Sequence, residues 1–205
     1  MLKTITLFLL LIIVSILKVN AQYTLEEIKN KPFFLGSSAF MLGNLVPDEK
    51  PNFVQLNLGY RISTKDAISL ELKTWRYFEP LGIPYDKSRT DPNKNFPGHI
   101  NEKGFAIAYQ RFLWKGLYSS IHIMNAWQGF TNEDGIKFDK GFQIFNTYRL
   151  GYHIKLFKGK FFIEPSLAIT HRPYHSKMPE SFKQIDDKWS KFFFGEPGLH
   201  FGFNF

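Results

Sequence analysis

The feature that most limits the fold is a series of short segments in which apolar and polar residues alternate. Every second residue from Val54 to Ile62 is apolar, and the same alternation returns from Ile68 to Leu72. The segments that carry the pattern are Phe33–Leu42, Phe53–Ile62, Ala67–Tyr77, Gly104–Leu113, Leu117–Trp127, Gly141–Ile154, Phe161–His171 and Phe192–Phe205. A helical period of 3.6 residues is missing from them. The alternation therefore predicts eight β-strands, each with one apolar and one polar face.

The connections between these segments alternate between long and short. The long ones are Gly43–Asn52, Glu79–Lys103, Gln128–Lys140 and Arg172–Lys191, and the short ones are Ser63–Asp66, Trp114–Gly116 and Lys155–Lys160. Tight periplasmic turns and long external loops are typical of bacterial outer-membrane barrels, whereas a Greek-key sandwich has no reason to alternate in this way. The sequence thus predicts an all-β fold, an eight-stranded antiparallel up-and-down transmembrane β-barrel.

The first 21 residues have the pattern of a secretory signal peptide. Lys3 supplies a basic start, Ile5–Leu17 is a 13-residue run that is almost wholly apolar, and Val19 and Ala21 occupy the −3 and −1 positions. The run is shorter than the roughly 20 residues that a membrane-spanning helix needs. We expect cleavage after Ala21, with residues 22–205 forming a single barrel domain.

The last segment ends in phenylalanine, with Phe201, Phe203 and Phe205 on one face. This arrangement resembles the C-terminal signal that the barrel-assembly machinery recognises in outer-membrane proteins. The pattern of residues 22–205 resembles the small barrels of the OmpA/OmpX type. The segments Tyr109–Gly116 and Phe162–Ser166 resemble a group of such barrels that has no assigned activity. The resemblance implies the outer membrane of a Gram-negative envelope, and it implies no particular chemistry.

Composition excludes several classes of site. The chain has no cysteine, which rules out a disulfide scaffold, a thiolate metal site and a thiol nucleophile. It has 23 phenylalanines, which suit lipid-facing strand positions and the aromatic belts at the membrane interfaces. The formal charge is +8, and it falls to +6 when Lys3 and Lys18 leave with the predicted signal peptide. Because export separates the protein from nucleic acid, we expect this charge to face lipopolysaccharide phosphates or an envelope partner, with no nucleic-acid binding.

The polar faces of the strands are expected to fill the barrel, because an eight-stranded barrel is only wide enough to hold side chains. Buried charges of both signs must be paired. The short turns are expected to place Arg61 opposite Ser69 and Arg149 opposite Ser166. We therefore predict one internal salt-bridge network with a structural role, formed by Arg61, Glu71, Lys73, Arg149 and Glu164.

Catalysis is the alternative, because some outer-membrane barrels hydrolyse or transfer acyl chains of lipid A with histidine, serine and a carboxylate. The candidate sets are His122 with Ser120, His200 with Glu196, and His175 and Ser176 with Glu180. None has the His-x-Ser order of the deacylase barrels, and no such set is confined to the external rim. Lipid A acyl hydrolysis or acyl transfer therefore stays the second hypothesis, and no catalytic residue is assigned.

Metal and cofactor sites are not predicted. Of the six histidines, only His171 and His175 are closely spaced, and they lie in a segment that contains proline. The external loops carry mixed charge, which suits contact with lipopolysaccharide or with another envelope protein. The favoured prediction is a non-enzymatic outer-membrane barrel with a side-chain-filled lumen and a structural or interaction role through its external loops.

Overall fold

The computed structural model describes residues 23–45, 50–77 and 98–205. The predicted signal peptide and most of the predicted loop Glu79–Lys103 lie outside the described residues. The strands are β1 (Phe33–Ser38), β2 (Val54–Arg61), β3 (Asp66–Tyr77), β4 (His99–Trp114), β5 (Leu117–Thr131), β6 (Lys137–Tyr152), β7 (Ile154–Leu156), β8 (Phe161–His175) and β9 (Phe192–Asn204). The helices are α2 (Leu25–Asn30), the 3₁₀ helix η1 (Ala39–Leu45) and α3 (Glu180–Asp186).

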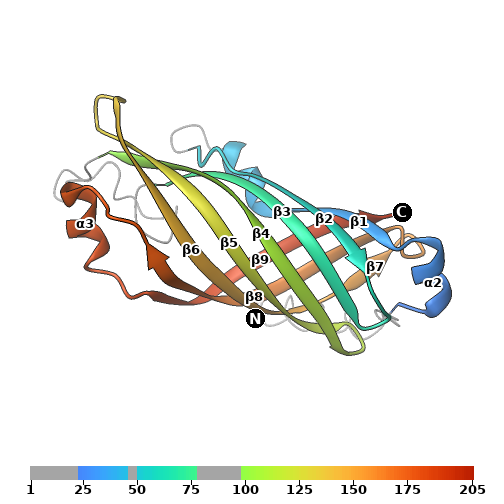
Figure 1. Ribbon diagram of the computed structural model, residues 1–205. Coiled ribbons are helices and arrows are strands. Elements are labelled where there is room, and N and C mark those ends of the chain that lie inside the picture. Colours follow the sequence, from blue (N-terminus) through green and yellow to red (C-terminus); the bar gives the residue numbers. More distant parts are fainter. Residues whose placement is uncertain (1–22, 46–49, 78–97) are drawn as a thin grey trace, which may run out of the picture.

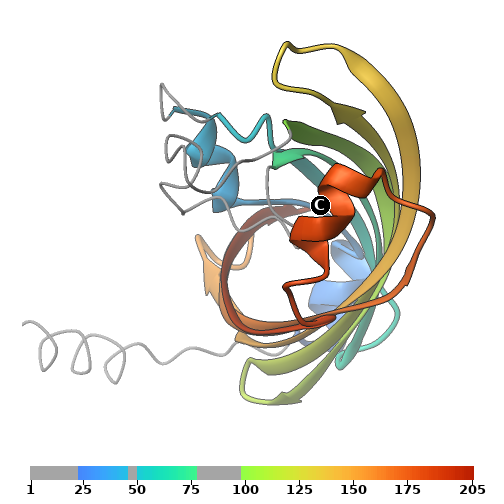
Figure 2. The ribbon, with the colours of Figure 1, turned by 90° about the vertical axis from the view of Figure 1, so that its left-hand side faces the viewer.

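The strands form one antiparallel sheet that closes into a ring (Figures 1 and 2). Strand β1 pairs with β2 on one side and with β9 on the other, and β6 pairs with β8. The short β7 follows β6 along the same edge of β8, so the ring has eight positions. Phe33 and Phe205 exchange two backbone hydrogen bonds, of 2.9 and 3.1 Å, where the last strand meets the first. The prediction of eight antiparallel strands is confirmed.

Tight turns join the strands at one end of the ring, which we call the turn end. Lys115 and Gly116 connect β4 to β5 and both have positive φ, 44° and 98°, as a two-residue type I′ turn requires. Between β2 and β3, the Ser63 hydroxyl donates to the Asp66 carboxylate at 2.7 Å. Helix α2 lies at this end too, whereas η1 and α3 lie at the opposite, loop end (Figure 1).

Several strands differ in length from the sequence prediction. The predicted loop Gln128–Lys140 is mostly strand, because β5 and β6 stay paired up to Thr131 and Lys137 and leave only residues 132–136 as the turn. The predicted segment Phe33–Leu42 is shorter, since β1 ends at Ser38 and the chain continues as η1. Helix α2 was not predicted, although Thr24 and Glu27 form a capping box at its start.

The expected strand registers are wrong by two residues in both hairpins. Arg61 lies opposite Ala67 rather than Ser69, because the turn closes on the hydrogen bond from the Ile62 amide to the Asp66 carbonyl. Arg149 lies opposite Ala168 rather than Ser166. Strand β7 extends the pairing with β8 as far as Leu156, so the turn is centred one residue later than expected. Each residue of β6 therefore pairs with a residue of β8 two positions further along the chain than expected.

The two faces of the ring have opposite chemistry. One outward row crosses β1 to β5 as paired aliphatic residues that are 42 to 63% exposed, namely Leu35, Leu58, Leu70, Ile107 and Ile123. Inward positions carry charged and polar side chains that are buried, such as Arg61, Glu71 and Glu164 at 2, 5 and 9% exposure. Among the described residues, no helix has the length and apolar character needed to cross a membrane.

Candidate functional site

Polar side chains inside the ring gather in three clusters along its axis. The turn-end cluster consists of Tyr23, Arg61, His153, Glu164 and Asn204. The middle cluster consists of Glu71, Ser120, His122, Arg149, Ser166, Thr170 and Glu196. The loop-end cluster consists of Tyr77, Glu102, Gln128 and Gln143. The turn-end and middle clusters join strands far apart in the sequence and therefore depend on closure of the ring, whereas the loop-end cluster lies across the neighbouring strands β3 to β6.

The turn-end cluster closes the ring around Tyr23, which precedes α2. The Tyr23 hydroxyl accepts hydrogen bonds from Arg61 Nη2 at 2.7 Å and Asn204 Nδ2 at 3.0 Å, and it lies 2.8 Å from His153 Nε2. Burial raises the pKa of the Tyr23 hydroxyl, although the nearby Arg61 charge opposes this rise. The hydroxyl therefore stays neutral and donates a hydrogen bond to His153 Nε2, while His153 Nδ1 contacts Glu164 at 2.7 Å.

A second contact fastens the N-terminal segment to the ring through Lys155. Lys155 Nζ donates to both carboxylate oxygens of Glu27 in α2, at 2.8 and 3.1 Å. Partial burial alone would raise the pKa of the Glu27 carboxyl, but the hydrogen bonds from Lys155 and Thr24 hold the pKa below its usual value. The Arg61 guanidinium also stacks 3.7 Å from the Tyr23 ring centroid. The turn end is thus sealed by residues 23–30.

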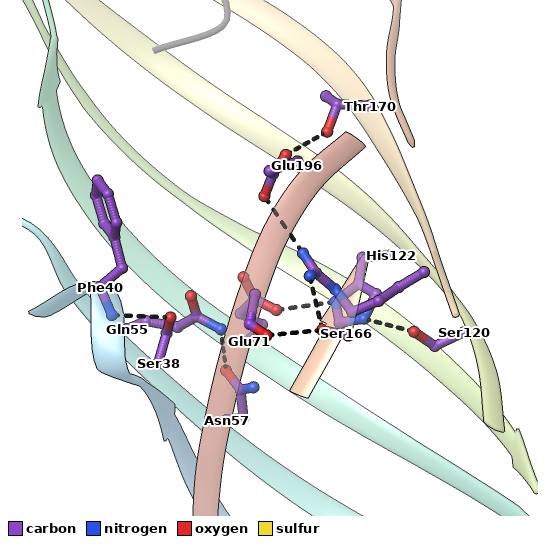
Figure 3. A network of polar contacts seen from close by, with 12 residues as sticks. Ser38, Phe40, Gln55, Asn57, Glu71, Ser120, His122, Ser166, Thr170 and Glu196 are labelled. Atoms are coloured by element: carbon purple, nitrogen blue, oxygen red, sulfur yellow. Dashed lines mark hydrogen bonds and ion pairs between the residues drawn. The ribbon is translucent and has the colours of Figure 1, made fainter. Parts of the chain in front are cut away.

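The middle cluster contains a serine, a histidine and a carboxylate in a chain (Figure 3). Ser120 Oγ lies 3.1 Å from His122 Nε2, and His122 Nδ1 lies 3.0 Å from Glu71 Oε2. Ser120 and His122 are two residues apart on β5 and so point to the same face. Glu71 reaches His122 across β4 because the inward residues there are the small, buried Ala106 and Ala108.

Arg149 lies beside this series of hydrogen bonds, directly opposite Ser120 in the pairing of β5 with β6. Its Nη1 donates to Ser166 Oγ at 3.0 Å, and its Nη2 donates to Glu196 Oε1 at 3.3 Å. Its Nε–H is buried and has no hydrogen-bond partner among the described residues. A buried donor without a partner is costly. Six buried side-chain atoms of the described residues have no partner, and Arg149 Nε is the one among them that belongs to the middle cluster, which makes it a candidate ligand contact.

The interior is not filled along its whole length, contrary to the predicted side-chain-filled lumen. Side chains pack the turn end, but a cavity of about 250 Å³ occupies the loop-end half. It is lined at its inner end by Glu71, His122 and Arg149, and at its outer end by Phe40 and Phe53. On β9, Gly198 also lines this cavity and contributes no side chain to fill it.

The predicted salt-bridge network does not form as one unit. Arg61 contacts Tyr23 and Asn204, whereas Glu71 and Glu164 contact histidines. Of the five predicted members, only Arg149 is paired with a carboxylate of the described chain, and that carboxylate belongs to Glu196.

Lys73 does not join that network, because its Nζ sits over aromatic rings, 4.6 Å from the centroid of Phe145 and 5.4 Å from that of Trp75. The prediction overlooked the interior histidines as partners: His122 and His153 lie closer to the two glutamates than the arginines do. The interior charges are therefore divided among separate clusters instead of being joined in one network.

The other two catalytic candidates are not assembled. No hydrogen bond joins His200 to Glu196 in the described chain, because residues four apart on a strand lie about 13 Å apart; Glu196 instead accepts from Thr170 at 2.7 Å. His175 Nδ1 faces the Ser176 carbonyl, and the Ser176 hydroxyl accepts from the Phe142 amide at 2.9 Å. Ser120 and His122 are thus the one predicted candidate set that the fold brings into hydrogen-bond distance within the described residues.

Comparison with known proteins adds no family. No protein-family model, curated protein or solved structure matches the chain. Within residues 23–45, 50–77 and 98–205, no three histidine, aspartate or glutamate side chains are placed to hold a metal ion. Any function must therefore be inferred from the geometry of the ring itself.

The sequence prediction missed the loop-end cluster and Tyr23. Glu102 Oε2 accepts from the Tyr77 hydroxyl at 2.8 Å and from Gln143 Nε2 at 2.5 Å. Glu102 falls in the predicted loop Glu79–Lys103, although it lies four residues before Ala106 and so shares the inward phase of Ala106 and Ala108. That phase was the available signal. Tyr23 had no signal, because it lies outside every alternating segment.

Proposed function

We propose that the protein is an eight-stranded β-barrel of the outer membrane, with a structural and interaction role in the cell envelope. The outward face carries this proposal. A soluble protein rarely exposes a large contiguous apolar patch, yet here aliphatic side chains continue from strand to strand while charges are buried inside. Lipid is the solvent that makes this distribution stable.

Ring closure supports the same placement. Lipid offers no hydrogen bonds, so a spanning sheet must satisfy every backbone group internally and have no open edge. The pairing of β1 with β9 supplies that closure. Phe203 on the last strand and Phe205 directly after it are 49 and 50% exposed, where the barrel-assembly machinery can reach them.

An aromatic row on the outward face supports a membrane boundary near the loop end. Ring centroids are 6.0 Å apart between Phe105 and Trp127, 5.4 Å between Trp127 and Phe142, and 6.2 Å between Phe142 and Tyr174. Amphipathic aromatic rings gather at the level of lipid headgroups. Because short turns are periplasmic and long loops external in such barrels, we propose that the loop end is external and the turn end periplasmic.

Three lysines adjoin this aromatic row and form what we call the lysine groove. Lys103 lies opposite Trp127, Lys140 lies opposite Gly129, and the side chain of Lys137 packs over Gly129. With Trp127 they line a groove of about 560 Å³, and no carboxylate of the described residues pairs with these ammonium groups. Unpaired cations beside lipid-facing aromatics fit the phosphates of lipopolysaccharide.

Replacing Lys103, Lys137 and Lys140 together by glutamine is expected to weaken lipopolysaccharide binding roughly 100-fold. Each lysine near an anionic lipid surface contributes about 1 kcal/mol, and about 1.4 kcal/mol corresponds to a tenfold change in affinity. The measurement is a titration of labelled lipopolysaccharide into the purified protein in neutral detergent. Binding by the unmodified protein should also weaken as salt is added.

The matched control for the lysine groove removes three exposed lysines at the turn end, Lys29, Lys65 and Lys158. This variant changes the net charge by the same amount and should retain the affinity. Equal losses in the two triple variants would show that net charge, rather than the groove, attracts the lipid.

The location itself is tested by fractionating cells that express the full chain. We expect the protein in the outer-membrane fraction, extracted by detergent and not by high salt. Without boiling it should migrate faster on a gel than after boiling, because a closed barrel resists unfolding by the gel detergent. Recovery in the soluble fraction without detergent would contradict the proposal.

A further inference from the structure

We propose that Ser120 is a nucleophile activated by His122 and Glu71, and that the interior cleaves carboxylic esters whose acyl chain enters through the loop-end cavity. This activity goes beyond the structural role proposed above. It rests on the arrangement of interior side chains, so it holds for the folded protein in detergent whatever its location in the cell.

The hydrogen-bond chain assigns each residue a role. An ionised carboxylate only accepts hydrogen bonds, so Glu71 fixes the imidazole proton on His122 Nδ1, at 3.0 Å. The lone pair of Nε2 then faces Ser120 Oγ at 3.1 Å and accepts its proton. A nucleophile within reach of a base that a third group orients is the arrangement that acyl transfer needs. Glu71 is a positioning residue, and Ser120 and His122 are catalytic residues.

Arg149 provides the donor that the reaction requires. Its side chain projects from the strand position opposite Ser120, and its buried Nε–H lacks a partner among the described residues. Attack on an ester places negative charge on the carbonyl oxygen, and a fixed donor beside that oxygen stabilises the transition state. The unpaired Nε–H is thus explained as a contact reserved for the substrate oxygen.

The cavities give the substrate a path to these groups. Ser120 lines a small cavity of about 30 Å³, which shares His122, Arg149 and His200 with the larger cavity of about 250 Å³. The outer lining of the larger cavity is apolar, with Phe40, Phe53 and Phe193. This shape fits a short acyl chain better than a long one, because the turn-end cluster closes the interior below Ser120.

The reaction proceeds in two steps. His122 Nε2 takes the proton as Ser120 Oγ bonds to the ester carbonyl carbon; the carbon–oxygen bond to the alcohol then breaks, and the alcohol leaves with that proton. In the second step His122 takes a proton from water, and the resulting hydroxide attacks the acyl-serine. The acyl–Oγ bond breaks, Ser120 regains the proton, and the carboxylic acid is released.

The test is covalent labelling of the folded protein in detergent by diisopropyl fluorophosphate, followed by intact mass measurement and peptide mapping. We expect one adduct per chain, located on Ser120 and absent from Ser120→Ala. His122→Gln should be labelled at least about 100-fold more slowly, since a positioned base contributes about 10² to 10⁴ in rate. Added imidazole should restore part of that rate by replacing the missing base.

One serine provides a matched control. Ser69 lines the same small cavity as Ser120, so Ser69→Ala should still be labelled at Ser120. Glu71→Gln should slow labelling, and Glu71→Asp, which keeps the carboxylate, should slow it less. The heat-dependent gel shift verifies that each variant is folded. No adduct on the folded protein, or an adduct that persists in Ser120→Ala, would overturn the proposal.

Discussion

Replacing Tyr23 by alanine is expected to lower the free energy of unfolding by about 3 to 5 kcal/mol, as for other large buried aromatic residues. The side chain is 5% exposed, and it packs edge-on against Phe112 at a centroid distance of 6.0 Å. Its removal leaves a cavity at the turn end. It also leaves Arg61 and His153 without the hydroxyl group that joins them, and buried polar groups without partners carry a further cost.

Tyr23→Phe separates these contributions, because it keeps the ring and removes only the hydroxyl. We expect it to cost about 1 to 3 kcal/mol, the range for leaving buried donors unsatisfied. The measurement is urea unfolding of the protein in lipid vesicles, followed by tryptophan fluorescence. Leu25→Ala is the control, since Leu25 is 78% exposed in the same segment and its loss should change little. A Tyr23→Ala effect below about 0.5 kcal/mol, the usual size of a surface change, would show that residues 23–30 do not seal the ring.

The strands could be predicted from the sequence because alternation is a local property. The strict alternation from Val54 to Ile62 fits a β-strand that has an apolar face on one side and a polar face on the other. Strand ends were harder to predict. At Gly129 and Lys140, cross-strand pairing carries β5 and β6 beyond the alternating segments, and a pairing partner is not a local signal.

The candidate site shows the same division. That Ser120 and His122 share a face follows from their spacing on one strand. Their contact with Glu71 could not be predicted, because it depends on the register of β3, β4 and β5 and on Ala106 and Ala108 leaving room between the strands. Errors of two residues in register moved the expected partners of Arg61 and Arg149 onto their neighbours and produced the mistaken single network.

A comparison of the two single variants Ile107→Arg and Leu113→Arg distinguishes a lipid-facing surface from a water-facing one. Both residues are exposed on β4, at 63 and 49%, but Ile107 lies in the middle of the strand and Leu113 lies next to the turn end. Arginine on the lipid face costs about 2 to 4 kcal/mol at the bilayer midplane and about 0 to 1 kcal/mol near the interface. On a surface in water, each change would usually stay within about 0.5 kcal/mol.

The most direct measurement is therefore the free energy of unfolding of these two variants and the unmodified protein, refolded into phospholipid vesicles and titrated with urea. If the ring is a transmembrane barrel, Ile107→Arg lowers the free energy of unfolding by about 2 to 4 kcal/mol and Leu113→Arg by about 1 kcal/mol or less. Equal and small effects at the two positions would show that the apolar row faces water and would contradict the placement of this protein in a membrane.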